Sequence, residues 1–203
     1  ADVFNIWYSF TNTLVGPFIY PAVAPAVLLN PAPIPMPMIT THDYARPSLD
    51  VVGPMPSLLP IGLPPGGVYV AWTNGAVIFV DASPAPAAGA PFGALTGGLG
   101  PLAVPGLIAV PIPPIIVGGI KVANTVAIAF DNGPICPGAL HMAWTDGVNG
   151  DLDVFMSTSL SGGAGWGPPV RVNQDPISNG LDQWAPQIEV NPASGEIMVT
   201  YYD

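Results

Sequence analysis

The residues whose types and spacing best suit metal chemistry lie in the stretch DGVNGDLD. Asp146, Asn149, Asp151 and Asp153 place four oxygen-bearing side chains close together, and the two glycines of the stretch allow sharp bends. Hard oxygen ligands at such spacing suit Ca²⁺. The same residue types also build tight hairpin turns. The stretch therefore predicts either a calcium site or a purely structural turn, and no other cofactor is expected.

Nucleophilic chemistry finds little support in the sequence. His42 is followed by Asp43, but neighbouring residues of an extended chain point in opposite directions, so this pair is not a dyad by itself. His141 alternates with apolar residues, which predicts a cross-strand polar residue. The single cysteine, Cys136, lies in PICPG without a base that could activate a thiolate. We expect this thiol to be buried or inert.

Glycoside hydrolysis requires two carboxylates that face one cleft. The acidic residues that could supply them outside DGVNGDLD are Asp43, Asp50, Asp182, Glu189 and Glu196. Glu189 alternates with apolar residues and Glu196 opens a strand-like stretch, so both are expected to be solvated charges at the edge of a sheet. Enzyme activity is therefore not favoured by the carboxylates.

Composition limits the partners. The chain has thirteen acidic residues and only three basic ones, Arg46, Lys121 and Arg171, so its net charge is −10. No basic patch is therefore expected that could bind nucleic acid. The one apolar stretch of membrane-spanning length, residues 99–120, contains five prolines that would break a helix, so no membrane span is expected.

The elements that must position these residues are short strands. The chain of 203 residues contains 24 glycines and 28 prolines, and only 8% of its residues are charged. Such a composition disfavours long helices and favours strands joined by turns. The sequence therefore predicts an all-β fold.

A repeated pattern organises these strands. GGVYVAWTNG, GALHMAWTDG and SGEIMVTYYD each read as an apolar strand between two turns, and each is preceded by a second strand-like stretch, in RPSLDVV, NTVAIAFD and APQIEVNP. A further strand is predicted in DVFNIWYS, AVIFVDAS and LDVFMSTS. These last stretches end in a serine that is followed by a turn and an aromatic residue. The residues that hold these positions are Ser9 and Phe18, Ser83 and Phe92, and Ser159, Gly163 and Trp166.

The last of these turns resembles the Asp box of the sialidase-like β-propeller family, whose consensus is S-x-D-x-G-x-T-W. Ser159, Gly163 and Trp166 occupy consensus positions, whereas Ser161 replaces the aspartate and Gly165 the threonine. In that family the box is a peripheral β-hairpin, in which the aspartate ties the loop backbone and the aromatic residue packs beneath the turn. The resemblance implies β-propeller-like blades of antiparallel strands. It does not imply sialidase activity, because that chemistry needs three arginines and this chain has two.

Aromatic side chains offer a binding hypothesis. Trp72, Trp144 and Trp166 hold repeat positions, where packing accounts for them. Trp7 and Trp184 fall outside these positions and are the candidates for ligand binding, with a glycan as the ligand.

The repeats divide residues 1–203 into about three blade units, with approximate segments 2–92, 93–166 and 167–203, in a single propeller-like domain. Long Pro/Gly-rich insertions at residues 19–38 and 94–119 are expected to be extended and to be covered by the domain or by another subunit.

The two ends of the chain match two halves of one blade. Residues 2–9 correspond to a third strand, and TYYD follows a second strand. Three arrangements remain open: the ends meet in a small ring, one chain completes the blade of the next in a closed oligomer or a filament, or the chain is part of a longer propeller protein.

Two functions are consistent with this pattern. One is a non-catalytic, exported, structural or adhesive subunit of an extracellular or cell-surface assembly that self-associates. The alternative is a fragment of a larger sialidase-like protein that binds or hydrolyses glycans.

Overall fold

Antiparallel β-sheets make up the structure, a computed structural model that describes residues 63–73, 76–84, 89–109 and 125–203 and, outside these ranges, seven short strands. The helical element of the described residues is a single 3₁₀ turn, η2 (Ala94–Thr96). The all-β prediction is confirmed. None of the sheets in the described part closes on itself.

The first large sheet contains β5 (Ser48–Val51), β6 (Val68–Thr73), β7 (Ile78–Ser83) and β8 (Leu102–Val104), in this order. Each strand pairs with the next one along the chain. In the central pair Trp72 lies opposite Phe79, and their rings stack with centroids 5.9 Å apart. The result is a four-stranded antiparallel meander.

The second large sheet repeats this order with β11 (Val126–Phe130), β12 (Leu140–Asp146), β13 (Asp153–Ser159) and β14 (Val170–Arg171). Trp144 lies opposite Phe155, as Trp72 lies opposite Phe79. The repeat that the sequence predicts is therefore a repeat of sheet structure.

The third unit consists of β15 (Trp184–Val190) and β16 (Ile197–Tyr202), which pair only with each other among the described strands. Their register shifts between Trp184 and Gln187, which marks a β-bulge. Ala185, inside this bulge, has a φ of 50°, a left-handed conformation that is uncommon for a residue with a side chain.

Six further strands pair locally in twos. β1 (Val3–Phe4) pairs with β4 (Ile34–Pro35), and β2 (Trp7–Tyr8) pairs with β3 (Val27–Leu28). β9 (Ile115–Val117) pairs with β10 (Ile120–Val122). Residues 2–9 thus form two short strands that pair with the first Pro-rich insertion, and the structure does not pair them with β16.

The second insertion, expected to be an extended segment covered by the domain or by another subunit, contributes a strand to the first large sheet. Residues 94–119 begin with η2 and then supply β8, the outer strand of the first large sheet. Prolines before and after β8 limit it to three residues, which is tolerated because an edge strand needs hydrogen bonds on one side only. Val104, Leu107 and Ile108 are buried against the core, so part of the insertion is covered by the domain itself.

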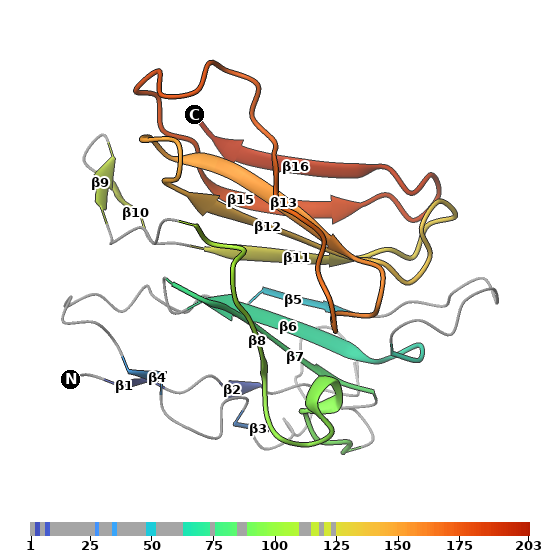
Figure 1. Cartoon of the computed structure of the whole chain (residues 1–203). Helices are drawn as coiled ribbons and strands as arrows, with labels where there is room; N and C mark the ends of the chain where they lie inside the picture. The colour runs from blue at the N-terminus through green and yellow to red at the C-terminus, as the bar shows by residue number, and fades with distance from the viewer. Residues whose placement is uncertain are drawn as a thin grey trace, which may run out of the picture.

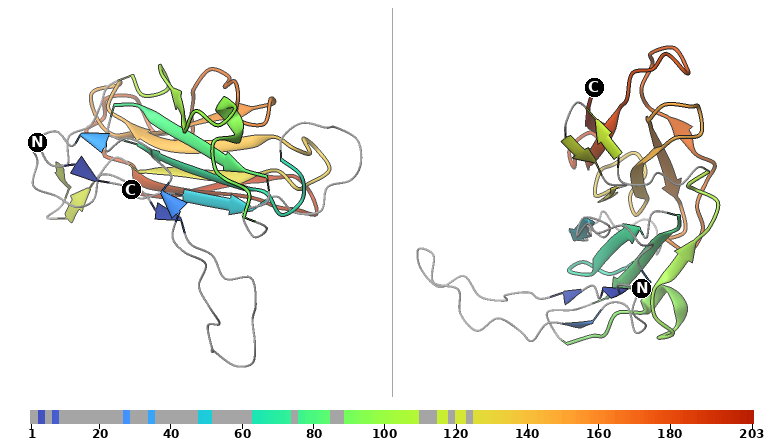
Figure 2. Two further views of the ribbon diagram at one scale, coloured as in Figure 1. Left: turned by 90° about the horizontal axis from the view of Figure 1, so that it is seen from below. Right: turned by 90° about the vertical axis from the view of Figure 1, so that its left-hand side faces the viewer.

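Strand β11 lies between neighbouring sheets (Figure 1), in contact with β15 on one side and with β5 and β6 on the other. Its side chains alternate accordingly. Val126, Ile128 and Phe130 join the large core shared with the first sheet, while Ala127 and Ala129 pack toward Ile188 of β15. Figure 2 (left) shows the long strands of successive sheets running in roughly the same line, one layer behind another. Both faces of β11 and of its neighbour β12 are therefore buried.

The structure also bears on two predictions, one about the thiol of Cys136 and one about a membrane span. Cys136, expected to be buried or inert, is exposed in the turn between β11 and β12, because PICPG lies at the rim of the sheet rather than in a strand. In the part of the chain that the structure describes, no helix is both long and apolar enough to cross a membrane.

Candidate functional site

The predicted metal ligands lie in and beside the turn that joins β12 to β13. Asp146 accepts hydrogen bonds from the backbone N–H of Val148 over 3.0 Å and from that of Ala109 over 2.6 Å. Asp151 accepts one from the N–H of Gly180 over 2.9 Å. Of the four candidates, Asn149 and Asp153 are joined directly, through Asn149 Nδ2 and Asp153 Oδ2 at 2.5 Å.

Asp153 is the fully buried centre of a polar cluster. Its Oδ1 accepts a hydrogen bond from Arg171 Nε over 2.7 Å and forms an ion pair with Arg171 Nη2 at the same distance. Asn173 Nδ2 donates to the same oxygen over 2.6 Å. Arg171 therefore neutralises a carboxylate that the sequence offered as a calcium ligand.

The cluster extends toward the end of β16. Asn173 Nδ2 also lies 2.7 Å from Gln183 Oε1, and Gln183 Nε2 donates to Asp203 Oδ1 over 2.9 Å. Asp175 receives hydrogen bonds from Asn173 and Arg171. The bond from Asn173, together with Asn179 and the charge of Arg171, lowers the pKa of Asp175. Asn173, Asp175 and Gln183 were not predicted as site residues, although the polar run RVNQD was a signal for the first two.

Calcium binding stays a prediction. Within the described residues, no group of three or more His, Cys, Asp or Glu side chains has a geometry that could hold a metal ion. Asp151 Oδ1 is buried and has no hydrogen-bond partner in the part of the chain that the structure describes, so one candidate ligand keeps an oxygen for another group. Asp182, a candidate for hydrolysis, instead accepts the N–H of Leu152 over 2.9 Å.

Side-chain hydrogen bonds hold the turn after β13, whose sequence was compared with an Asp box. The buried Ser159 Oγ accepts the N–H of Gly163 over 2.9 Å, and Ser161 Oγ accepts the N–H of Gly165 over 2.8 Å. Trp166 Nε1 donates to the carbonyl of Gly163 over 3.1 Å, and its ring packs against the large core. Ser161 thus ties the loop where the consensus has aspartate.

In the corresponding turn of the first unit, an aspartate on the preceding strand, Asp81, binds the backbone of the turn. Ser83 Oγ donates to the carbonyl of Ala90 over 2.8 Å, and Phe92 follows in the same turn. The buried Asp81 accepts the N–H of Ala82 and that of Gly93, each over 2.7 Å, while its Oδ2 has no hydrogen-bond partner within the described ranges. Burial raises the pKa of Asp81 to about 6. An aspartate inside the apolar stretch AVIFVDAS was the signal for it. Ser9 and Phe18 lie outside the described residues.

We expect Asp81→Asn to remove a pH dependence of stability. Because the folded-state pKa is about 6 and the ordinary value 3.8, the folded protein binds this proton more tightly than the unfolded chain does. The stabilisation is complete below pH 3.8 and is lost as the pH rises through about 6. At neutral pH the variant should be more stable by about 1–3 kcal/mol. Urea unfolding at several pH values measures this.

Asp175→Asn is the matched control, because the pKa of Asp175 is lowered and its contribution is lost as the pH falls. If the free energy of unfolding of Asp81→Asn changes with pH in parallel with that of the wild type, Asp81 is not the source of the pH dependence.

His141 lies among groups that could form a nucleophilic triad. Its Nδ1 lies 2.9 Å from Thr158 Oγ1, and its Nε2 lies 3.8 Å from Asp131 Oδ2. Thr158 is its cross-strand partner, as the alternation predicts. His141 and Asp131 are only 3% and 1% exposed, and burial lowers the pKa of His141 despite the nearby carboxylate. A substrate does not reach this imidazole, so the group is structural.

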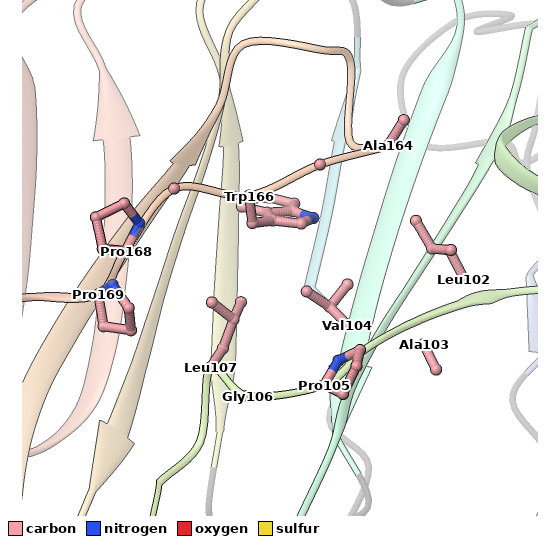
Figure 3. Close-up of a pocket in the computed structure, with 12 residues that line it drawn as sticks. Leu102, Ala103, Val104, Pro105, Gly106, Leu107, Ala164, Trp166, Pro168 and Pro169 are labelled. Carbon is pink, nitrogen blue, oxygen red and sulfur yellow. The ribbon is translucent and has the colours of Figure 1, made fainter.

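A pocket lined by mainly apolar side chains and by backbone lies between the two large sheets (Figure 3). It has a volume of about 380 Å³ and is lined by residues 102–107 around β8 and by residues 164–169 of the Asp-box-like turn. In this view Trp166 lies at the upper side of the pocket, and Leu107 lies below it on the segment that follows β8. The lining contains no charged side chain, so the pocket offers contact surface without acid–base chemistry.

The structure describes the side chain of only one of the two tryptophans that were predicted to bind a ligand. Trp7 belongs to β2, and its side chain lies outside the described residues. Trp184 stacks on Tyr202, with ring centroids 4.6 Å apart and an interplanar angle of 15°. Tyr202 is 62% exposed. The pair therefore forms an aromatic surface beside the cluster of Gln183 and Asp203.

No family model, curated protein or solved structure gives a significant match to this chain.

Proposed function

We propose that the chain is a non-catalytic structural or adhesive subunit with propeller-like blades, and that it self-associates when a strand of one copy completes the β15–β16 sheet of another. The observation that carries the proposal is the outer edge of β16. Strands β6 and β12, its counterparts in the other units, are flanked by paired strands on both sides, whereas β16 pairs with β15 alone among the strands that the structure describes. An uncovered edge is a template for pairing with another chain.

The side chains of β16 support this. Met198 and Tyr202 are about 60% exposed, and Ile197 is 39% exposed, which is unusual for large apolar residues in a strand. Adding a strand along the middle of β16 would satisfy the outward backbone groups and cover part of the apolar surface of Ile197 and Met198.

The proposed occupant is the segment of residues 2–9 from a second copy. Its Asp-Val-Phe sequence is identical to that of Asp153, Val154 and Phe155, which begin β13. Strand β13 pairs with β12, the counterpart of β16. The occupant therefore resembles the strand that holds this position in the second sheet.

The lack of catalytic function rests on the engaged polar groups. His141 is buried, and Arg171 is held by Asp153 and Asp175, so it is not available to clamp a substrate carboxylate. Location outside the cell or at its surface belongs to the same proposal.

Light scattering coupled to size-exclusion chromatography tests self-association. We expect the mass to rise with protein concentration above 20.8 kDa. Met198→Lys adds a charge to the exposed edge strand and should shift the protein toward the monomer. Gln187→Lys, on the inner strand β15, is the control and should leave the mass unchanged.

A second variant tests the backbone of the edge. Because the N–H of Asn191 donates to the carbonyl of Glu196, the alternation of an antiparallel ladder points the N–H of Val199 away from β15. Val199→Pro should therefore block strand addition and preserve the existing pair. A monomer at high concentration, or an oligomer unaffected by both variants, would overturn the proposal. A much heavier chain in native material, seen by intact mass spectrometry, would favour a larger sialidase-like protein.

A further inference from the structure

The aromatic surface of Trp184 and Tyr202 combines three features of a binding site: exposure, rigidity and adjacent hydrogen-bonding groups. We propose that this surface binds a sugar ring of a neutral, hydroxyl-rich glycan, with Tyr202 stacking on the ring and Asp203 accepting hydrogen bonds from its hydroxyl groups. This inference concerns the exposed ring of Tyr202 and does not depend on self-association.

The indole ring of Trp184 holds the exposed ring of Tyr202 in place by stacking on one of its faces. Trp184 begins β15 and Tyr202 ends β16, and the two residues lie opposite each other in the sheet. Their rings are nearly parallel and 4.6 Å apart, so Trp184 supports one face of Tyr202. Since Tyr202 is 62% exposed, a ligand has access to the remaining surface of its ring.

The backbone around Trp184 is fixed on both sides. Gln183 is buried, its N–H donates to the carbonyl of Leu152 over 2.7 Å, and its side chain bonds to Asn173 and Asp203. On the other side, Ala185 adopts its left-handed conformation within the bulge. Strained backbone that the surroundings hold in place is often found at functional sites. A preorganised surface loses little entropy when a ligand binds.

The charges around the surface select the ligand. Asp203 uses Oδ1 to bind Gln183, and a carboxylate has a second oxygen to offer. The pKa of nearby Asp175 is lowered, so it is ionised at neutral pH. The neighbouring cation, Arg171, already pairs with Asp153 and Asp175. Ionised carboxylates accept hydrogen bonds from hydroxyl groups and repel anionic ligands. Neutral sugars therefore fit, and sugars that carry carboxylate or phosphate do not.

Titration with cellotetraose and with chitotetraose tests the proposal, with tryptophan fluorescence and calorimetry as readouts. We expect saturable binding of at least one of these neutral probes, and weaker or no binding of sialyllactose, which is anionic. Tyr202→Ala should lower the affinity about tenfold or more, because it removes the stacking ring. Tyr202→Phe keeps the ring and should stay within about threefold of the wild type.

Met198→Ala is the matched control, since Met198 is an exposed apolar residue on the same strand, and it should not change the affinity. Asp203→Asn provides a second variant that should weaken binding if Tyr202→Ala fails to fold. The titrations are repeated with Met198→Lys, so that a failure of self-association leaves the binding result interpretable. Absence of saturable binding to both neutral probes, equal binding by Tyr202→Ala, or tighter binding of sialyllactose would overturn the proposal.

Discussion

Replacing Asp153 by alanine is expected to lower the free energy of unfolding by about 3–5 kcal/mol. Asp153 is fully buried and is held by Arg171, Asn149 and Asn173. Its removal takes away the buried carboxylate of the two that pair with Arg171, leaves only the partly exposed Asp175 beside the guanidinium, and leaves amide groups unpaired in the interior. Urea unfolding followed by circular dichroism measures the loss.

Asp175→Ala is the matched control for this prediction. Asp175 also pairs with Arg171, but its side chain is 24% exposed and water replaces part of the lost interaction. We expect a clearly smaller loss than for Asp153→Ala, because exposed ion pairs contribute little to stability. The double variant Asp153→Ala/Arg171→Ala should lose less than the sum of its single variants, because both act on one ion pair. Equal effects of Asp153→Ala and Asp175→Ala would contradict the central role of Asp153.

The strands were predictable because burial leaves a period of two in the sequence. In β11, valine, isoleucine and phenylalanine alternate with alanine, and the structure turns the large residues to one neighbouring sheet and the small ones to the other. Strand β8 escaped prediction because three residues between prolines carry too little periodicity. Its pairing depends on the edge of β7, which no local pattern describes.

The candidate sites, too, were predictable where their contacts are local in sequence and unpredictable where the contacts join distant residues. The turn at Ser159 was predictable because its bonds join residues within a few positions, such as Ser159 to Gly163 and Trp166 to Gly163. The cluster around Asp153 was not, because Asp153 and Asn173 are separated by 20 positions and meet only after the sheets have formed. Sequence spacing grouped Asp153 with Asp146, and the two residues are indeed cross-strand partners in β12 and β13. The ion pair between Asp153 and Arg171, in contrast, had no signal in the local sequence.

Trp144→Ala is expected to lower the free energy of unfolding by about 3–5 kcal/mol. Trp144 is fully buried in the core shared by the two large sheets and stacks on Phe155, with ring centroids 6.4 Å apart. The substitution leaves a large cavity that rigid sheets on both sides cannot fill. Trp166→Ala, at a partly exposed tryptophan beside the pocket, is the control and should cost about 1–2 kcal/mol.

Trp144→Phe separates packing from hydrogen bonding at the same site. The indole Nε1 of Trp144 is buried without a hydrogen-bond partner among the described residues, which is unfavourable for a polar group. Phenylalanine keeps an aromatic ring against Phe155 and removes that unpaired donor, so part of the loss in volume is offset. We expect a cost of about 1–2 kcal/mol, well below that of Trp144→Ala. If both variants lose the same stability in urea unfolding, the ring does not stabilise the interface between the sheets as the packing implies.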